Sequence, residues 1–183
     1  MRVIAGTARS LPLKTPEGRH TRPTTDRIKE TLFNILQSRI PGCVFVDIFS
    51  GSGGIGIEAL SRGAKMAYFL ENDRNALRCI SENLQFTGFE KEGILLSGDA
   101  AVSVARISES ADIIFLDPPY GCGLEQTVLD RLLSCSCLTE NTVLILEAPA
   151  GYDVASLERS GYQVTRQKKY KTNQHVFLQW EEK

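Results

Sequence analysis

The sequence predicts an α/β fold of the Rossmann-like type, with a mostly parallel seven-stranded sheet that ends in an antiparallel C-terminal hairpin. Short apolar runs alternate with amphipathic helical stretches between residues 44 and 159, and this alternation is typical of parallel strands covered by helices on both faces. A glycine-rich turn directly follows the first apolar run. After Gly161, the segments 163–170 and 175–180 are joined by Lys171-Thr-Asn-Gln, which indicates a hairpin at one sheet edge.

The first 41 residues are expected to form a short basic extension followed by one helix. Glycine and proline interrupt residues 1–23, so short strands or loops are expected there. Pro23-Thr-Thr-Asp26 is a helix start, and Pro41-Gly42 is expected to end that helix. The helix would present one apolar stripe, formed by Ile28, Leu32, Ile35 and Leu36.

The alternating region, residues 42–183, is expected to be a catalytic core, and the whole chain, residues 1–183, a single domain. Its expected parallel strands lie at residues 44–49, 66–70, 94–96, 112–116 and 142–146. Its expected helices lie near residues 54–62, 74–86, 100–107, 124–134 and 153–159. Ligands of such sheets bind beyond the carboxyl ends of the strands, so the residues at those ends are the candidates for function.

The composition favours a soluble globular protein. The chain has 183 residues, of which 42% are hydrophobic and 23% charged, and it holds no apolar stretch of the roughly 18 residues that would suggest a membrane span. The N-terminus lacks the apolar region of a signal peptide, so we expect a cytoplasmic protein. We also expect the protein to be a monomer. The five cysteines form no C-x-x-C pair, which favours reduced thiols and no bound metal.

Positive charge is concentrated at the N-terminus. The net charge of the chain is −1, yet residues 1–29 carry seven basic and two acidic side chains, a local charge of +5 that leaves −6 on the remainder. A second basic cluster comprises Arg166, Lys168, Lys169 and Lys171. Such patches fit a polyanion bound at one face, although similar runs also occur on ordinary solvated surfaces.

The glycine-rich turn predicts a cofactor site. Gly51, Gly53 and Gly56 follow a strand and open a helix, where glycines permit a tight turn and close approach of a ligand. Asp47 stands four residues before Gly51 and would repel a phosphate but attract an amino group. This charge favours S-adenosylmethionine over NAD as the cofactor, and Phe49 is included in the same binding set.

Two further strand ends are expected to complete the cofactor site. Glu71 follows the second strand, 20 residues after Gly51, where a carboxylate can accept both ribose hydroxyls of either cofactor; Asn72 lies beside it. Asp99 and Ala100 follow the third strand and are expected to contact the adenine. Glu71 and Asp99 could equally cap the helices that follow them.

The fourth strand ends in Asp117-Pro118-Pro119-Tyr120, the most specific motif of the sequence. The prolines stiffen the backbone and remove two N–H donors, so the Asp117 carboxylate and the Pro118 carbonyl offer acceptors to one planar amino group. Tyr120 can stack on the ring that carries that amine. These four residues are the predicted catalytic set, and the motif predicts methylation of an exocyclic amine. A paired base must be flipped out to reach it.

Six stretches are similar to one enzyme family: residues 1–6, 21–27, 32–36, 47–53, 58–64 and 115–120. On these stretches the chain resembles the RsmD family of 16S ribosomal RNA guanine-N2 methyltransferases. The resemblance implies a class I methyltransferase fold and methyl transfer from S-adenosylmethionine, without a metal, to N2 of a guanine in 16S ribosomal RNA of the small ribosomal subunit. It further implies RNA-binding roles for Arg2, Arg9, Arg22, Thr24 and Arg27.

Some positions depart from the family pattern, and two other functions remain open. Ser50 replaces the usual Ala, Asn72 the common Lys, and Lys171 the frequent Gly. From the residues alone, the acceptors of the fourth strand suit adenine N6, cytosine N4 or a protein amide equally well. A different class of function is an RNA-binding assembly factor with a vestigial cofactor pocket, which intact Asp47, Glu71 and Asp117 disfavour.

Overall fold

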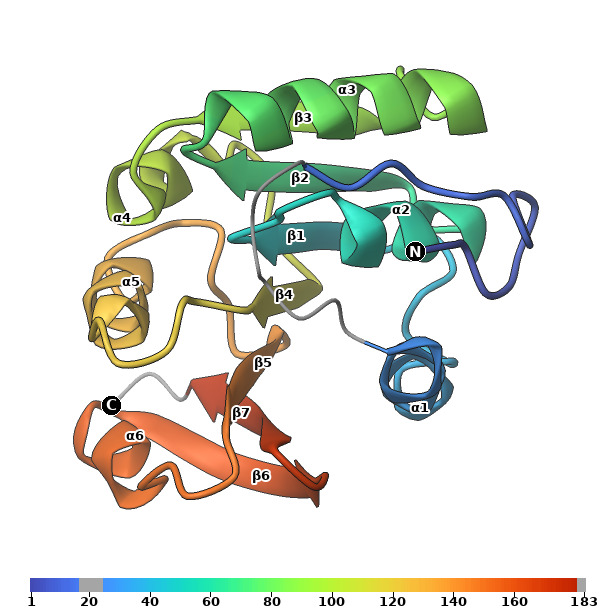
Figure 1. The fold of residues 1–183 in the computed structure, drawn as a ribbon. Helices are drawn as coiled ribbons and strands as arrows, with labels where there is room; N and C mark the ends of the chain where they lie inside the picture. The colour runs from blue at the N-terminus through green and yellow to red at the C-terminus, as the bar shows by residue number, and fades with distance from the viewer. Residues whose placement is uncertain (17–24, 181–183) are drawn as a thin grey trace.

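The computed structural model describes residues 1–16 and 25–180, and in this part of the chain it contains a seven-stranded sheet (Figure 1). The strand order is β3-β2-β1-β4-β5-β7-β6. The strands are β1 (Val44–Ile48), β2 (Met66–Glu71), β3 (Gly93–Ser97), β4 (Ile113–Leu116), β5 (Val143–Pro149), β6 (Tyr162–Lys169) and β7 (Asn173–Trp180). The first five strands run parallel, whereas β7 is antiparallel to β5 and β6. The predicted fold class is confirmed.

Helices cover both faces of the sheet (Figure 1). They are α1 (Asp26–Ile35), α2 (Gly54–Ser61), α3 (Arg74–Thr87), α4 (Ala100–Ser103) with the 3₁₀ turn η1 (Val104–Arg106), α5 (Leu124–Leu132) and α6 (Ala155–Arg159). Apolar side chains of α1, α2 and α3 pack on the sheet face that carries Phe45, Phe69 and Phe115. Those of α4, η1, α5 and α6 pack on the opposite face with Val46 and Ile48. Strands β1, β2, β4 and β5 are therefore buried on both faces, which explains their continuous apolar runs.

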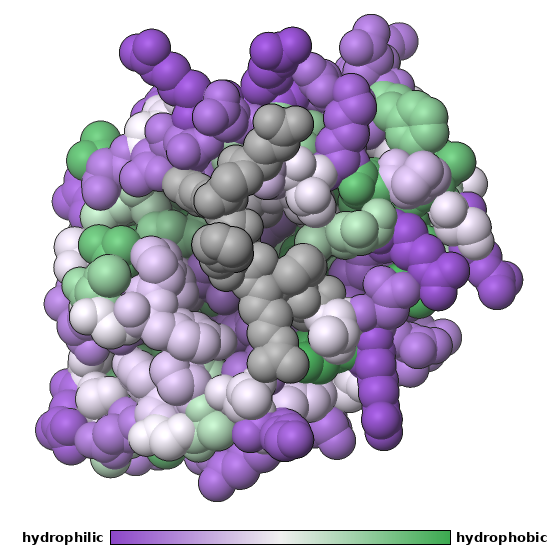
Figure 2. Space-filling model, viewed as in Figure 1, coloured by the Kyte–Doolittle hydropathy of each residue, from purple (hydrophilic) through white to green (hydrophobic). Residues whose placement is uncertain are grey.

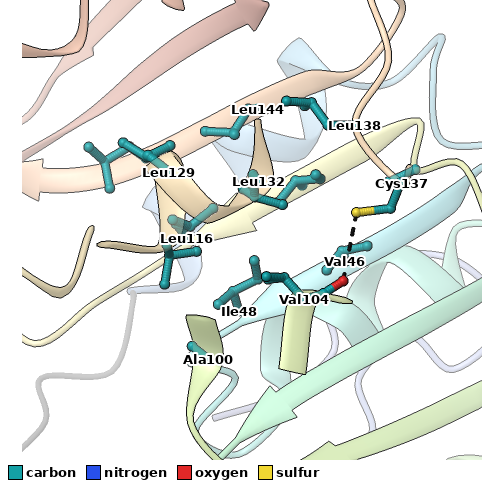
Figure 3. Close-up of a cluster of buried hydrophobic side chains, with 14 of the residues drawn as sticks. Val46, Ile48, Ala100, Val104, Leu116, Leu129, Leu132, Cys137, Leu138 and Leu144 are labelled. Carbon is teal, nitrogen blue, oxygen red and sulfur yellow. Dashed lines mark hydrogen bonds between the residues drawn. The ribbon is translucent and has the colours of Figure 1, made fainter. Parts of the chain in front are cut away.

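The core on the α5 side is made mainly of aliphatic side chains, part of which Figure 3 shows. Leu129 and Leu132 of α5 meet Val46, Ile48 and Leu116 from the strands, and all five are fully buried. The Cys137 thiol lies 4.0 Å from the Val104 carbonyl oxygen. Burial raises the pKa of this thiol to about 12, so Cys137 remains a neutral packing residue.

Several expected boundaries were wrong. Helix α1 ends at Ile35 rather than at Pro41, because residues 36–39 turn towards β1. Strand β5 continues past Leu146 to Pro149, and β7 begins at Asn173 rather than at His175. The polar residues that appeared to belong to the turn extend the ladder, since Asn173 pairs with Pro149.

A buried carboxylate is among the groups that fix the N-terminal segment to the core. Glu58 of α2 accepts hydrogen bonds from the backbone N–H groups of Ile4 and Ala5 at 2.7 and 3.0 Å. Its oxygens also lie 3.3 Å from Lys29 Nζ and 2.7 Å from Arg62 Nε. Lys29 and Glu58 are 1% and 0% exposed, so Lys29 belongs to the core and not to the basic surface that its charge suggested.

Candidate functional site

The three glycines of the first turn serve different purposes. Gly51 has a φ of +56° and no atom within 4 Å of the position of a Cβ, so its side faces open space. Gly53 has a φ of +77° and forms the N-cap of α2. A Cβ on Gly56 would clash with the Phe69 ring. Only Gly51 therefore leaves room for a ligand, whereas the other two allow the turn and the packing of α2 on β2.

Phe49 marks the start of this turn with a φ of +63°. Its N–H and that of Ser50 donate to the Leu70 carbonyl oxygen at 3.0 and 3.1 Å. The Ser50 hydroxyl donates to the Asp47 carbonyl at 2.6 Å. The serine found in place of alanine therefore adds a hydrogen bond that stabilises the turn. A positive φ at a bulky residue costs free energy and is concentrated at functional sites.

Asp47 lies inside the end of β1 and faces the loop, as its spacing predicted. Its Oδ2 accepts the Gly56 N–H at 2.9 Å, and the residue is 2% exposed. Burial raises the pKa of Asp47 to about 7, against the opposing effect of the Gly56 N–H. Asp47 thus fixes the glycine turn directly, and its second oxygen is the group available to a ligand's amino group.

Glu71 ends β2 and joins it to the glycine turn. Its Oε2 accepts the Gly51 N–H at 2.9 Å, and its Oε1 accepts the N–H groups of Asn72 and Asp73 at 2.9 and 3.0 Å. The carboxylate is therefore held in one orientation, 6% exposed. A carboxylate offers about four lone pairs, and these three backbone N–H groups occupy most of them.

The other predicted cofactor residues lie at neighbouring positions. Asp99 is exposed and caps α4, with its Oδ1 3.2 Å from the Val102 nitrogen, which leaves Oδ2 for another donor. Ala100 is buried directly behind it, and Asn72 is exposed after Glu71. The capping role considered for Asp99 is present in the structure, but Asp73 rather than Glu71 caps α3.

The Asp117-Pro-Pro-Tyr segment leaves β4 as an irregular stretch. The Asp117 N–H donates to the Ile48 carbonyl at 3.2 Å, so the residue is fixed to β1. Pro118 is buried, Pro119 is exposed and Tyr120 is 48% exposed. Within the described residues no hydrogen bond occupies the Asp117 carboxyl. Burial, followed by the neighbouring Glu147 and Asp47, raises the pKa of Asp117 well above its ordinary value.

The register of the sheet brings the predicted cofactor residues and the predicted catalytic residues to one edge of the sheet. Leu70, Ile48, Leu116 and Leu146 are aligned across β2, β1, β4 and β5. The next residues along these strands, Glu71, Phe49, Asp117 and Glu147, therefore follow one another at the carboxyl edge. Neighbouring strands are about 4.8 Å apart, so Glu71 and Asp117 are separated only by the width of β1.

Sequence reasoning missed the last member of this row, Glu147. Its Oε1 accepts the Asn173 amide at 2.7 Å, and its Oε2 lies 3.1 Å from His175 Nε2. The Tyr170 hydroxyl is 3.3 Å from His175 Nδ1. The only available sequence signal was a carboxylate directly after a buried apolar run, the same signal that identified Asp117. Together these four residues form a buried polar cluster beside Asp117.

A cavity of about 240 Å³ borders Glu147 of this cluster and Pro118 and Tyr120 of the Asp-Pro-Pro-Tyr segment. Its lining includes Pro118, Tyr120, Glu147 and Tyr152. It therefore combines two aromatic rings with acceptor groups. Among the described residues, no group of three or more His, Cys, Asp and Glu side chains is arranged to hold a metal ion.

The predicted RNA-binding residues are only partly described. Arg9 and Arg27 are exposed, whereas Arg2 is exposed but forms an ion pair with Asp26 at 2.8 Å. Arg22 and Thr24 lie outside the described residues. The face shown in Figure 2 is mostly hydrophilic, with separate hydrophobic patches. In the described part of the chain, no helix is both long and apolar enough to cross a membrane.

Comparison with known proteins places these features in one family. The family model described as conserved hypothetical protein 95 matches residues 1–179. The Bacillus subtilis protein YlbH is 42% identical over 80% of this chain and 82% of its own length. Ribosomal RNA small subunit methyltransferase D of Haemophilus influenzae is 36% identical over 80% of this chain and 78% of its own length. The solved structure of yhhF from Escherichia coli has a TM-score of 0.85 and 30% identity, covering 100% of this chain and 99% of that one.

Proposed function

The chain belongs to the family of conserved hypothetical protein 95, and from this premise we propose that it transfers a methyl group from S-adenosylmethionine to N2 of a guanine in 16S ribosomal RNA. The relative from Haemophilus influenzae carries the name of a small-subunit ribosomal RNA methyltransferase. We take residues 42–183 as the catalytic core and residues 1–41 as the extension that contacts RNA. The observation that carries the proposal is the alignment of Glu71 and Asp117 on either side of β1.

The residues at the ends of β1, β2 and β3 suit the cofactor. Gly51 borders open space, and Glu71 beside it would accept the ribose hydroxyls. Asp99 and Ala100 would contact the adenine, and Asp47 the amino group of the methionine part. When bound, S-adenosylmethionine supplies an electrophilic methyl group on a positively charged sulfur. The acidic lining is consistent with that charge and would disfavour the phosphates of NAD.

Asp117 and Pro118 then act on the target amine. The lone pair of an exocyclic amine is delocalised into its ring, so the group is a weak nucleophile. Hydrogen bonds from its two N–H groups to the Asp117 carboxylate and the Pro118 carbonyl favour a pyramidal nitrogen and direct its lone pair towards the methyl group. Asp117 can take up the proton that the amine loses. Most of the acceleration comes from holding the reacting atoms in line.

Tyr120 and the basic residues bring the base to these acceptors. A guanine stacked in a helix cannot reach the cavity, so it must be flipped out at a cost of a few kcal/mol. Stacking on an aromatic ring contributes about 1–3 kcal/mol, and the half-exposed Tyr120 is placed to supply it. Contacts of Arg9 and Arg27 with phosphates would add affinity that falls as salt rises.

The proposal is tested by methylation of undermethylated small ribosomal subunits. Wild-type protein and labelled S-adenosylmethionine should yield labelled 2-methylguanosine after nuclease digestion, at one mapped nucleotide. The Asp117→Ala variant should lose transfer while its affinity for S-adenosylmethionine stays unchanged in calorimetry. Wild-type protein that leaves the RNA unlabelled, or labels another atom, would refute the proposal. Full activity of Asp117→Ala would remove Asp117 from the mechanism.

A further inference from the structure

The acceptors Asp117 and Pro118 do not by themselves distinguish one amino-bearing base from another. Adenine, cytosine and guanine all carry an exocyclic amine, and all three can donate two N–H groups. They differ at the ring nitrogen beside that amine. In guanine this atom is N1, which carries a hydrogen, whereas N1 of adenine and N3 of cytosine carry a lone pair. A second fixed acceptor in the cavity would therefore select guanine.

Glu147 occupies the position that such an acceptor requires. Leu116 and Leu146 are paired between β4 and β5, so Asp117 and Glu147 are the next residues on adjacent parallel strands. Asp117 directly follows the end of β4 and Glu147 lies in β5, and continuing the strand alternation by one residue places both side chains on the same face of the sheet. Glu147 also lines the cavity together with Pro118 and Tyr120. A base stacked on Tyr120 with its amine at Asp117 would present its ring edge to Glu147.

The Glu147 carboxylate is rigidly held yet has acceptor capacity left. The Asn173 amide occupies one lone pair of Oε1 at 2.7 Å, and His175 contacts Oε2 at 3.1 Å. The Tyr120 hydroxyl also hydrogen-bonds to Glu147, so about one of four lone pairs remains for a ligand. His175 is fixed in turn by the Tyr170 hydroxyl at 3.3 Å and packs edge-on against Phe115, with ring centroids 5.8 Å apart. A carboxylate anchored in this way cannot turn away from an unsuitable base.

We propose that Glu147 is the specificity-determining residue for guanine, with its carboxylate accepting N1–H of the target base while Asp117 and the Pro118 carbonyl accept the N2 amine. This inference rests on the proposed function and names the basis of its base selectivity. Adenine or cytosine in the same position would direct a ring-nitrogen lone pair at a carboxylate. Two acceptors would then face each other without a hydrogen, which is repulsive and leaves both unsatisfied.

The test compares target bases that differ at N1. Small subunits are reconstituted with guanine, 2-aminopurine or 6-thioguanine at the nucleotide mapped above. 2-Aminopurine keeps the 2-amino group but lacks N1–H and O6, whereas 6-thioguanine keeps N1–H and changes only atom 6. For wild-type protein, kcat/KM should be about 10-fold to 100-fold lower with 2-aminopurine than with guanine, and 6-thioguanine should behave like guanine.

The second part of the test compares the same bases with the Glu147→Gln variant. Its amide has the same shape, and its oxygen can accept from guanine N1–H or its N–H can donate to N1 of 2-aminopurine. The preference for guanine over 2-aminopurine should therefore shrink at least about tenfold. Equal use of both bases by the wild-type protein overturns the inference whether or not the variant folds. A folded variant that binds S-adenosylmethionine and keeps the wild-type preference overturns it too. Absence of guanine methylation by wild-type protein instead marks failure of the proposed function.

Discussion

Glu147 and His175 face each other directly in the antiparallel β5–β7 ladder, and their side chains meet with Oε2 3.1 Å from Nε2. This contact joins the C-terminal hairpin to the row of residues at the carboxyl edge of the parallel strands. His175 is fully buried and Glu147 is 7% exposed. The hairpin therefore does more than close one sheet edge, because it sets the orientation of a carboxylate beside Asp117.

His175 should act as a positioning residue for Glu147. His175→Phe keeps an aromatic ring against Phe115 but removes the contact to Oε2, so Glu147 loses one of its fixed partners. We expect kcat on small subunits to fall about tenfold, while the affinity for S-adenosylmethionine is unchanged because that site lies across β1. Steady-state kinetics and calorimetry measure the two quantities. A purely structural role for His175 would leave kcat of the folded variant at the wild-type value.

The pH dependence of methylation should reflect Asp117. Burial and the carboxylates of Glu147 and Asp47 raise the pKa of Asp117 above 3.8, and only its ionised form can take up the proton that the amine loses. The rate should therefore rise with pH on the acidic side of the pH–rate profile. This rise, the acid limb, should lie at higher pH than an Asp with an ordinary pKa would give. Glu147→Gln removes one negative neighbour, lowers the pKa of Asp117 and should move that limb to lower pH.

The control for this shift is Glu125→Gln, which changes an acid that lines the same cavity but does not raise the pKa of Asp117. The other titratable groups near Asp117 and Glu147 are Asp47 from β1, Tyr120 after β4, Tyr170 after β6 and His175 from β7. The rate of a single turnover is measured across the pH range. If the acidic side of the pH–rate profile does not move in Glu147→Gln, Glu147 does not raise the pKa of Asp117.

Glu71 should control the binding of S-adenosylmethionine rather than the chemistry. Glu71→Ala removes the acceptor for the ribose hydroxyls and releases the Gly51 N–H. Hydrogen bonds to a charged group contribute about 1.5–3 kcal/mol each, so calorimetry should show affinity weakened by at least about tenfold. Glu90→Ala, at an exposed acid beyond α3, is the control and should bind normally. Wild-type affinity of Glu71→Ala would contradict the assignment of the ribose site.

Glu58 should contribute strongly to stability without touching the reaction. Glu58→Gln leaves Lys29 buried and without its counter-charge, and breaking a buried ion pair costs about 3–5 kcal/mol. Denaturant unfolding measures this loss. Glu82→Gln removes the partner of Lys14 and Arg78 at the surface and should scarcely change the free energy of unfolding. Equal effects of the two substitutions would show that the Glu58 cluster does not hold the N-terminal segment.

The parts of the site that could be predicted from the sequence lie at the ends of strongly apolar strands. Glu71 and Asp117 directly follow such runs, so their positions at the carboxyl edge follow from the alternation of strands and helices. The glycine turn could also be predicted from the sequence, because Gly51 and Gly53 adopt backbone angles that other residues avoid. These are local signals, and each needs only the residues within a few positions.

Glu147 and Lys29 could not be placed in the same way because tertiary partners determine their environments. The apolar run of β5 stops at Leu146, and only pairing with Asn173 and Gln174 extends the strand to Pro149. Those two polar residues resembled a turn, yet Asn173 donates to Glu147 across the sheet. Lys29 looked like part of a basic surface until Glu58, 29 positions away, supplied its buried partner.

The central claim is that the cofactor and the target amine share one sheet edge, on either side of β1. A crystal structure of the protein with S-adenosylhomocysteine tests it most directly. We predict the ribose hydroxyls on the Glu71 carboxylate and the sulfur directed towards Asp117, with space between them for a methyl group and an amine. A ligand bound elsewhere, or one whose sulfur points away from Asp117, would contradict the claim.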